Sequence, residues 1–338
     1  MKSFTVEVKN GRKVYIGNSA ELLGELLPKG GRVVVITDST IQSHYGTIME
    51  GYERIVIGEG EGNKTLQSVE TICRKLLEMG ADRKVFLLGI GGGIVSDVTG
   101  FVASIYMRGV DFGFISTTLL SQVDAGVGGK NGVNLDGYKN IIGCFNQPHF
   151  VICDTSMLKT LSDREFRSGL AELIKGAIIA DSELFTQLEG MTFQELRQCE
   201  QTLAAMVLRA VEIKAEIVAR DEREAGDRRL LNLGHTYAHA IEKLSREMTH
   251  GEAVAVGCVI ACGKSVNRGM MSAQSKERIE AMLERMEFVT TPPVEQSKLD
   301  SVIGRDKKAE GDSIYFVFPV EIGRCVAEKI ELSQLISH

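Results

Sequence analysis

Short apolar runs rich in β-branched residues alternate with helical periodicity through the first half of the chain. This alternation restricts the fold more than any other feature of the sequence. The expected elements are strands at Val33–Ile36, Ile55–Ile57, Val85–Leu88, Phe112–Ile115 and Phe150–Cys153, with a helix at Leu66–Leu77. Apolar strands separated by helices predict a parallel sheet that is covered by helices on both faces. In such sheets, ligands bind at the carboxyl ends of the strands.

Helical patterns dominate the second half of the chain, from about Asp163 onward. The expected elements are helices beginning at Asp163 and Ser182, longer amphipathic helices at Gln201–Arg220 and Ser275–Phe288, and a strand at Ser313–Val320. A length of 338 residues suits about two domains. We place the boundary near residues 155–162 and expect an α/β domain at 1–158 and a mainly α-helical domain at 159–338.

The composition excludes several classes of protein. A formal net charge of -6 argues against a nucleic-acid binder, which normally carries a basic surplus. The seven cysteines are scattered without a C-x-x-C pair, so neither a disulfide framework nor a zinc ribbon is expected. The N-terminus has no apolar signal core, and the longest apolar stretch, Ala253–Cys262, is far short of the ~20 residues that span a bilayer. We therefore expect a soluble, cytoplasmic protein.

A glycine-rich turn at Gly89–Gly93 follows the strand Val85–Leu88. Glycines there let the backbone approach a pyrophosphate closely, with a helix N-terminus behind it. The spacing differs from the G-x-G-x-x-G fingerprint, so a purely structural turn is equally compatible. Asp97 and Asp38 could each bind a ribose or amide group of a dinucleotide, although Asp38 could instead cap a helix.

Other polar groups follow the neighbouring strands. Glu61 and Lys64 lie in a loop that could hold a nucleoside, and Thr117-Thr118 adds two hydroxyls, but a solvated turn and a helix cap are the alternatives. A second glycine-rich segment carries Lys130 and is followed by Lys139. Glycine-rich backbone beside lysines suits a phosphate ester, with a flexible loop as the alternative.

Three of the six histidines fall in one short segment, at positions 235, 239 and 250. His235 and His239 share one face if the segment is helical. Glu172 lies three residues before Lys175 in an apolar helical pattern, where burial of the carboxylate would require a cation. Glu172, His235 and His250 would form a His₂Glu set like those of catalytic zinc sites. The alternatives are an exposed ion pair for Glu172 and structural roles for the histidines.

These motifs, taken in their order along the chain, resemble the 3-dehydroquinate synthase family over nearly the whole sequence. The resemblance rests on Gly60-Glu61 with Lys64, Gly91-Gly92-Gly93 with Asp97, Tyr106-Met107-Arg108-Gly109, Thr117-Thr118, Gln122-Val123-Asp124, Gly128-Gly129-Lys130, Lys139-Asn140, Ala171-Glu172 with Ile174-Lys175, Leu231-Asn232 with Gly234-His235-Thr236, His239-Ala240-Ile241-Glu242, and His250-Gly251-Glu252-Ala253.

The resemblance implies an NAD-binding N-terminal domain, a C-terminal helical domain and an active site in the cleft between them. It also implies NAD, one divalent metal (Zn²⁺ or Co²⁺) and a homodimer. The implied reaction converts 3-deoxy-D-arabino-heptulosonate 7-phosphate to 3-dehydroquinate with elimination of phosphate, in the shikimate pathway of aromatic amino acid biosynthesis.

The resemblance also implies roles for individual residues. Glu172, His235 and His250 would bind the metal. The implied catalytic residues are Lys130, Asn140 and His239 on the phosphate side, Lys175, Lys214, Arg228 and Asn232 for the hydroxyls and carboxylate, Asp124, Arg108 across the dimer interface, and a C-terminal lysine at Lys307 or Lys308. The assigned cofactor-binding residues are Asp38, Glu61, Lys64, Gly91, Gly92, Gly93, Asp97, Thr117, Thr118, Lys130, Lys139, Lys159 and Thr160.

Three alternative functions are compatible with parts of this pattern. The first is a related sugar-phosphate cyclase that makes a valiolone or an inosose, but Asn232 and His239 favour dehydroquinate because valiolone-type enzymes tend to replace both. The second is a glycerol-dehydrogenase-like NAD alcohol dehydrogenase, which would not need the anion-binding set Lys130, Lys139 and Arg228. The third is a non-catalytic binding protein, which the number of intact motifs argues against.

Overall fold

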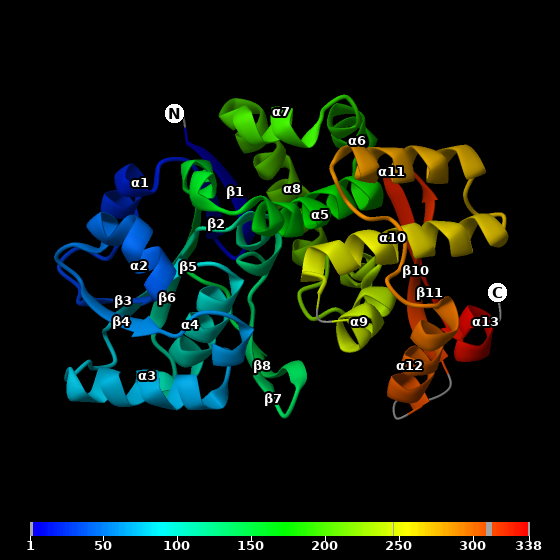
Figure 1. Cartoon of the computed structure of the whole chain (residues 1–338). Coiled ribbons are helices and arrows are strands. Elements are labelled where there is room, and N and C mark those ends of the chain that lie inside the picture. Colours follow the sequence, from blue (N-terminus) through cyan, green and yellow to red (C-terminus); the bar gives the residue numbers. More distant parts are fainter. Residues whose placement is uncertain (1–2, 246, 309–312, 337–338) are drawn as a thin grey trace. The chain divides into compact units, whose positions relative to one another are not determined.

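The computed structural model describes residues 3–245, 247–308 and 313–336, without the side chains of residues 305–308. The predicted Lys307 and its alternative Lys308 therefore lie outside the described side chains. The chain divides into two compact units (Figure 1). The first contains Met1–Ser162 with Lys214–Ala219, and the second contains Asp163–Ile213 with Arg220–His338.

The first unit is built on a seven-stranded sheet with the order β1-β2-β9-β6-β5-β3-β4. Its strands are β1 (Phe4–Lys9), β2 (Arg12–Ile16), β3 (Val33–Asp38), β4 (Glu53–Ile57), β5 (Phe86–Gly91), β6 (Asp111–Ser116) and β9 (Phe150–Cys153). The pair β1–β2 is antiparallel and the other pairs are parallel. The predicted α/β class with a parallel sheet is confirmed, and the antiparallel edge hairpin is an addition to it.

Helices and short turns connect these strands. They are α1 (Ser19–Leu26), α2 (Ser39–Tyr45), η1 (Gly46–Met49), η2 (Glu61–Asn63), α3 (Leu66–Glu78), α4 (Gly93–Ile105), η3 (Tyr106–Arg108), η4 (Ser121–Ala125) and η5 (Thr155–Thr160). A separate antiparallel hairpin, β7 (Lys130–Leu135) with β8 (Tyr138–Phe145), packs against α4. The predicted lysine-bearing glycine-rich loop is thus partly a hairpin.

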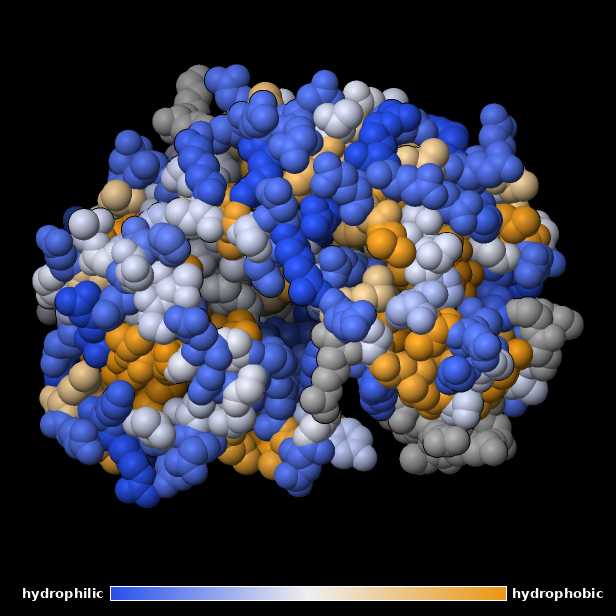
Figure 2. All heavy atoms as spheres, viewed as in Figure 1, coloured by the Kyte–Doolittle hydropathy of each residue, from blue (hydrophilic) through white to orange (hydrophobic). Residues whose placement is uncertain are grey.

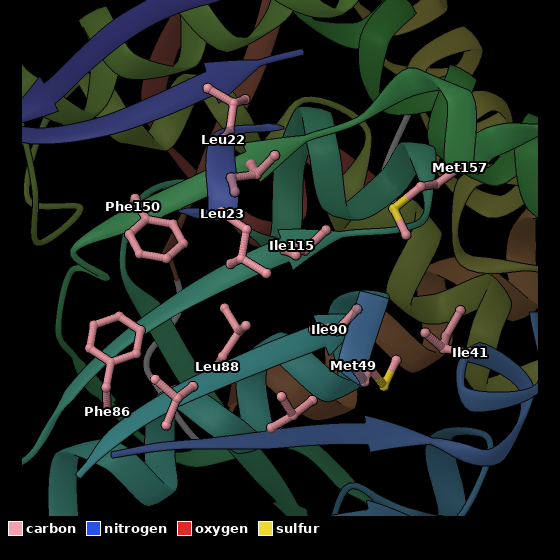
Figure 3. Close-up of a cluster of buried hydrophobic side chains, with 13 residues drawn as sticks. Leu22, Leu23, Ile41, Met49, Phe86, Leu88, Ile90, Ile115, Phe150 and Met157 are labelled. Atoms are coloured by element: carbon pink, nitrogen blue, oxygen red, sulfur yellow. The ribbon is translucent and has the colours of Figure 1, made fainter. Parts of the chain in front are cut away.

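The core beneath α1 and α2 fixes the sheet (Figure 3). Leu88, Ile90 and Ile115 project from neighbouring central strands and are fully buried. Phe86 and Phe150 stack with ring centroids 5.6 Å apart. Burying one such aliphatic or aromatic side chain contributes about 1.5–3 kcal/mol, so this cluster holds the strand ends in a fixed register.

The second unit is mainly helical. Its elements are α5 (Asp163–Ala180), α6 (Ser182–Glu189), α7 (Phe193–Gln198), α8 (Glu200–Arg220), η6 (Asp227–Asn232), α9 (His235–Leu244), α10 (His250–Asn267), α11 (Ala273–Arg285), α12 (Gln296–Lys308), α13 (Leu332–Ile336), and the hairpin β10 (Ser313–Glu321) with β11 (Arg324–Glu331). The predicted helix starts at Asp163 and Ser182 are confirmed. Asp181 caps α6 by accepting from two backbone N–H groups.

On the face in Figure 2, hydrophobic side chains form separate patches among hydrophilic ones. Among the described residues, no helix combines the length and the apolar character that crossing a bilayer requires.

Candidate metal centre and cofactor-binding residues

The second unit brings together one carboxylate and two imidazoles from three helices. Glu172 lies in the middle of α5, and its side chain is 1% exposed. His235 and His250 are the first residues of α9 and α10. Their Nε2 atoms lie 3.8 Å and 3.4 Å from Glu172 Oε1. The ligand atoms of the three residues all lie within 4.8 Å of one another, so a single ion could contact all three.

The local sequence fixes both histidines at helix starts. Gly234 has φ +79° and immediately precedes His235. A Cβ at position 234 would lie 2.8 Å from the backbone nitrogen of Cys258, so only glycine fits between α9 and α10. Thr249 and Glu252 form a capping box at the start of α10, which fixes the backbone of His250.

Charges in this cluster are strongly coupled. Burial alone would raise the pKa of Glu172, but Lys175 and the two imidazoles outweigh it and hold that pKa well below 4.5. Burial and the neighbouring Lys175 lower the pKa of His235 to about 3. For His250, burial lowers the pKa, but hydrogen bonds with Glu172 and Glu242 prevail and raise it to about 9. His235 is thus neutral and ready to ligate a metal at physiological pH.

The donor set fits a zinc or cobalt ion. Both oxygens of Glu172 are buried, and their nearest partners are cationic or ring N–H groups: Lys175 Nζ forms an ion pair with Oε2, and His250 Nε2 lies 3.4 Å from Oε1. Lys175 also donates to the carbonyl of Leu231 (2.6 Å). A buried carboxylate requires cationic partners, and two imidazoles with one carboxylate leave open positions on a metal.

Other predicted residues of the second unit lie near this cluster. The rings of His239 and His235 are 5.5 Å apart, and His239 is exposed. Arg228 is only 2% exposed, so its guanidinium is buried rather than a surface charge. Asn232 donates its side-chain amide to Glu224, a residue with φ +62° that the motifs did not single out.

The first unit gathers a second group of predicted residues. Lys64 is buried and contacts both the carboxylate of Asp97 and the side-chain oxygen of Asn140. Glu61 accepts from Asn134 (2.7 Å), whose own oxygen accepts from the backbone of Asn140 (2.8 Å). The contacts join η2, α4 and the β7–β8 hairpin into one polar network.

A further ion pair joins Asp124 of η4 to Lys214 of α8. Lys214 donates to the carbonyl of Asp124 (2.7 Å) and to its carboxylate. Lys214 belongs to the short piece of α8 that groups with the first unit.

The glycine turn predicted after β5 joins the strand directly to the start of α4. β5 ends at Gly91, and α4 begins at Gly93 with no side-chain cap. A Cβ at Gly92 would lie 2.9 Å from the Thr118 methyl group, so a side chain there would displace Thr118. Thr117 is buried and its hydroxyl has no partner among the described residues. Backbone N–H groups at the start of a helix suit a pyrophosphate.

The remaining predicted residues lie at the surface of the first unit or cap a helix. Exposed side chains are found at Lys130, Lys139, Lys159, Thr160 and Arg108. Asp38 caps α2 by accepting a hydrogen bond from the backbone N–H of Ile41 (2.8 Å), which confirms the helix cap given as its alternative role. Burial raises the pKa of Asp38 above its ordinary 3.8, although the N–H groups of Ile41 and Thr40 oppose the shift.

Replacing Asp97 by asparagine should change how stability depends on pH. Burial raises the pKa of Asp97 to about 6, above the ordinary 3.8, although Lys64 opposes the shift. Ionisation therefore costs the folded state more than the unfolded one, and the free energy of unfolding falls as the pH rises through this window. The loss amounts to at most roughly 3 kcal/mol for such a shift.

Asparagine cannot ionise, so the Asp97→Asn variant should gain stability relative to the parent protein between about pH 4 and pH 7. Urea unfolding across this range tests it, and parallel curves for the two proteins would contradict it.

The comparisons with known proteins cover the chain almost completely. The family model for the 3-dehydroquinate synthase N-terminal region matches residues 54–168, and the one for the C-terminal region matches residues 169–309. A 3-dehydroquinate synthase from Campylobacter curvus (strain 525.92) is 42% identical over 327 residues, which are 94% of this chain and 92% of that protein.

Solved structures of related enzymes share the fold. A 2-epi-5-epi-valiolone synthase from Streptomyces hygroscopicus subsp. jinggangensis 5008, with NAD⁺ and Zn²⁺ bound, superposes with a TM-score of 0.87 at 25% identity and covers 99% of this chain and 97% of its own. A 2-deoxy-scyllo-inosose synthase complexed with carbaglucose-6-phosphate, NAD⁺ and Co²⁺ gives a TM-score of 0.86 at 21% identity, with 99% and 98% covered.

Proposed function

Because the chain belongs to the 3-dehydroquinate synthase family, we propose that it converts 3-deoxy-D-arabino-heptulosonate 7-phosphate into 3-dehydroquinate and inorganic phosphate. The observation that carries this proposal is the meeting of Glu172, His235 and His250 around one point. The C-terminal family model spans all three residues, and they come from three separate helices. We assign NAD binding to residues 1–158 and metal and substrate binding to residues 159–338.

The two cofactors are NAD and one divalent metal, Zn²⁺ or Co²⁺. Structural relatives that hold NAD⁺ with either metal support both assignments. Glu172, His235 and His250 would hold the metal, which would supply a Lewis acid that favours ionisation of a substrate hydroxyl, and NAD⁺ bound to the first unit would supply a reversible hydride acceptor. The chain's own residues bind and orient the substrate for these steps and exclude water from it.

The cationic residues suit the two anionic ends of the substrate. Buried Arg228 offers a planar, permanently charged donor for the carboxylate, and Asn232 and Lys175 can bind hydroxyls. Lys130 and Asn140 are assigned to the phosphate. His239 is exposed beside His235, where an imidazole can hold or pass on a proton.

The dinucleotide is assigned to the first unit. The N–H groups at Gly91–Gly93 would bind the pyrophosphate, and Asp38, Asp97 and Thr117 would bind the ribose and nicotinamide groups. The other members of the assigned set are Glu61, Lys64, Thr118, Lys139, Lys159 and Thr160.

The finer assignments concern assembly and location. We propose a homodimer in which Arg108 reaches the partner's site. Arg108 is exposed and has φ +70°, directly after Met107 with φ +50°, so the backbone projects both side chains from a tight turn. We also propose a cytoplasmic location, consistent with cysteines that are all unpaired.

A phosphate-release assay tests the proposed reaction directly. With NAD⁺ and Zn²⁺ or Co²⁺, the purified protein should release one phosphate per heptulosonate 7-phosphate consumed, without net accumulation of NADH. The hydride returns to the substrate within each turnover, so NAD⁺ is regenerated. Steady NADH production with glycerol or other simple polyols, and no phosphate release, would instead identify a dehydrogenase.

A further inference from the structure

His250 is held from both sides of its ring by carboxylates. Its Nε2 lies 3.4 Å from Glu172 Oε1, and its Nδ1 lies 3.3 Å from Glu242 Oε1. The Glu242 side chain is 12% exposed, so water competes little for this contact. A carboxylate accepts hydrogen bonds only, so each ring nitrogen carries a proton toward the carboxylate that it faces. A metal ion held by Glu172 would replace the proton on Nε2, while the proton on Nδ1 would stay with Glu242.

The second histidine is oriented in the same way by a different group. His235 Nδ1 lies 3.2 Å from the backbone carbonyl of Leu233. Both imidazoles therefore engage Nδ1 with an oxygen acceptor and direct Nε2 toward Glu172. For His235 the acceptor is fixed by the backbone. For His250 it is a side chain, so it can be changed by substitution.

Glu242 lies on the same helix as the other imidazole ligand. His235 and Glu242 are seven residues apart in α9, which places them on one face two turns apart. Helix α9 thus supplies one metal ligand itself and the hydrogen-bond acceptor for the ligand on α10. The helix is anchored independently by buried Tyr237 and Ile241.

We propose that Glu242 is a positioning residue of the metal centre, which fixes the tautomer and ring orientation of His250. Acceptance of the Nδ1–H by a carboxylate also makes Nε2 a stronger ligand. This inference rests on the proposed function, because it presupposes a metal at Glu172, His235 and His250. It adds a role for a residue outside that ligand set.

Metal affinity tests the proposal without reference to turnover. The full-length protein is stripped with a chelator and titrated with Co²⁺ in competition with a chromogenic chelator, and the visible absorption of bound Co²⁺ is recorded. Glu242→Ala should weaken Co²⁺ binding about 10- to 100-fold and alter the Co²⁺ spectrum. Glu242→Gln keeps an acceptor oxygen without the charge, so it should weaken binding by less, about threefold to tenfold. Glu277→Gln, an exposed glutamate of α11, is the matched control and should bind as the parent does.

The outcomes separate this proposal from the one on which it rests. If the parent protein fails to bind Co²⁺ or Zn²⁺, the proposed metal-dependent function is wrong. If the parent binds and both Glu242 variants match its affinity and spectrum, the positioning role is wrong. Should Glu242→Ala fail to fold, the Gln variant decides alone: weakened binding with an altered spectrum supports the role, and parental values for both overturn it.

Discussion

Glu172→Gln is expected to yield a protein that retains no metal and releases phosphate at least about a thousandfold more slowly, as losses of groups that act as a unit do. The neutral amide is a poor ligand for a divalent ion. Its NH₂ group also cannot accept a hydrogen bond from the imidazole of His250 or coordinate a metal. The carboxylate is also the partner of buried Lys175, so the substitution removes the anion that the site is built around. Both losses come from one oxygen-to-nitrogen exchange with almost no change in volume.

Metal content and phosphate release, measured on the same preparation, check this result. Breaking a buried ion pair costs about 3–5 kcal/mol, so a lower midpoint of unfolding is expected as well, and circular dichroism must show that the fold survives. Glu277→Gln, at an exposed position far along the chain, controls for the chemical change. A metal-free Glu172→Gln protein with parental phosphate release would remove the whole site assignment.

Much of the fold followed from local pattern. The predicted strand Phe150–Cys153 has the same bounds as β9, and the predicted helix Leu66–Leu77 differs from α3 by one residue. Both segments are strongly periodic or continuously apolar, and their ends carry turn or cap residues. In such segments local preference and burial agree, so the pattern alone predicts the element.

The hairpin β7–β8 could not be predicted in the same way. Its sequence is rich in glycine and asparagine, which disfavour strands. It forms because buried Asn131 donates to the carbonyls of Gly129 and Asn146 and because β7 packs on α4. The contact with Asn146 and the packing on α4 join residues distant in sequence, and tertiary packing overrides local preference there.

The three candidate metal ligands could be predicted from their residue types, whereas most of the residues that surround them could not. A carboxylate in an apolar helical pattern and a cluster of imidazoles are visible in the sequence. Glu224, which holds Asn232, depends on a left-handed backbone at position 224 that no local signal announces. Glu242 had a usable signal, its seven-residue spacing from His235, which places both on one face if the segment is helical. The burial of Arg228 had none, because it depends on a turn stabilised by Asp221.

Gly251→Ala should move His250 on α10 away from Glu172 on α5 and so weaken metal binding. A Cβ at position 251 would lie 2.1 Å from the carbonyl oxygen of Ser168 and 2.5 Å from its Cα. Both atoms are backbone of α5, one turn before Glu172, so no side-chain rotation can relieve the overlap. α10 must move away from α5, and it carries His250 with it. We expect a loss of about 1–3 kcal/mol of unfolding free energy, as in overpacked cores.

The same helix supplies the control that makes this test decisive. Gly263 also lies in α10, but a Cβ there would meet only the flexible end of Lys276, at 3.8 Å. Gly263→Ala should therefore raise stability by about 0.5–1 kcal/mol, because alanine loses less backbone entropy in a helix. Thermal unfolding and Co²⁺ titration of both variants separate the effect of helix propensity from that of the close approach of α10 to α5.

Both changes are Gly→Ala on one helix. Weaker Co²⁺ binding in Gly251→Ala alone would therefore show that the spacing of the metal ligands depends on the α5–α10 contact. Parental stability and Co²⁺ affinity in Gly251→Ala would contradict it.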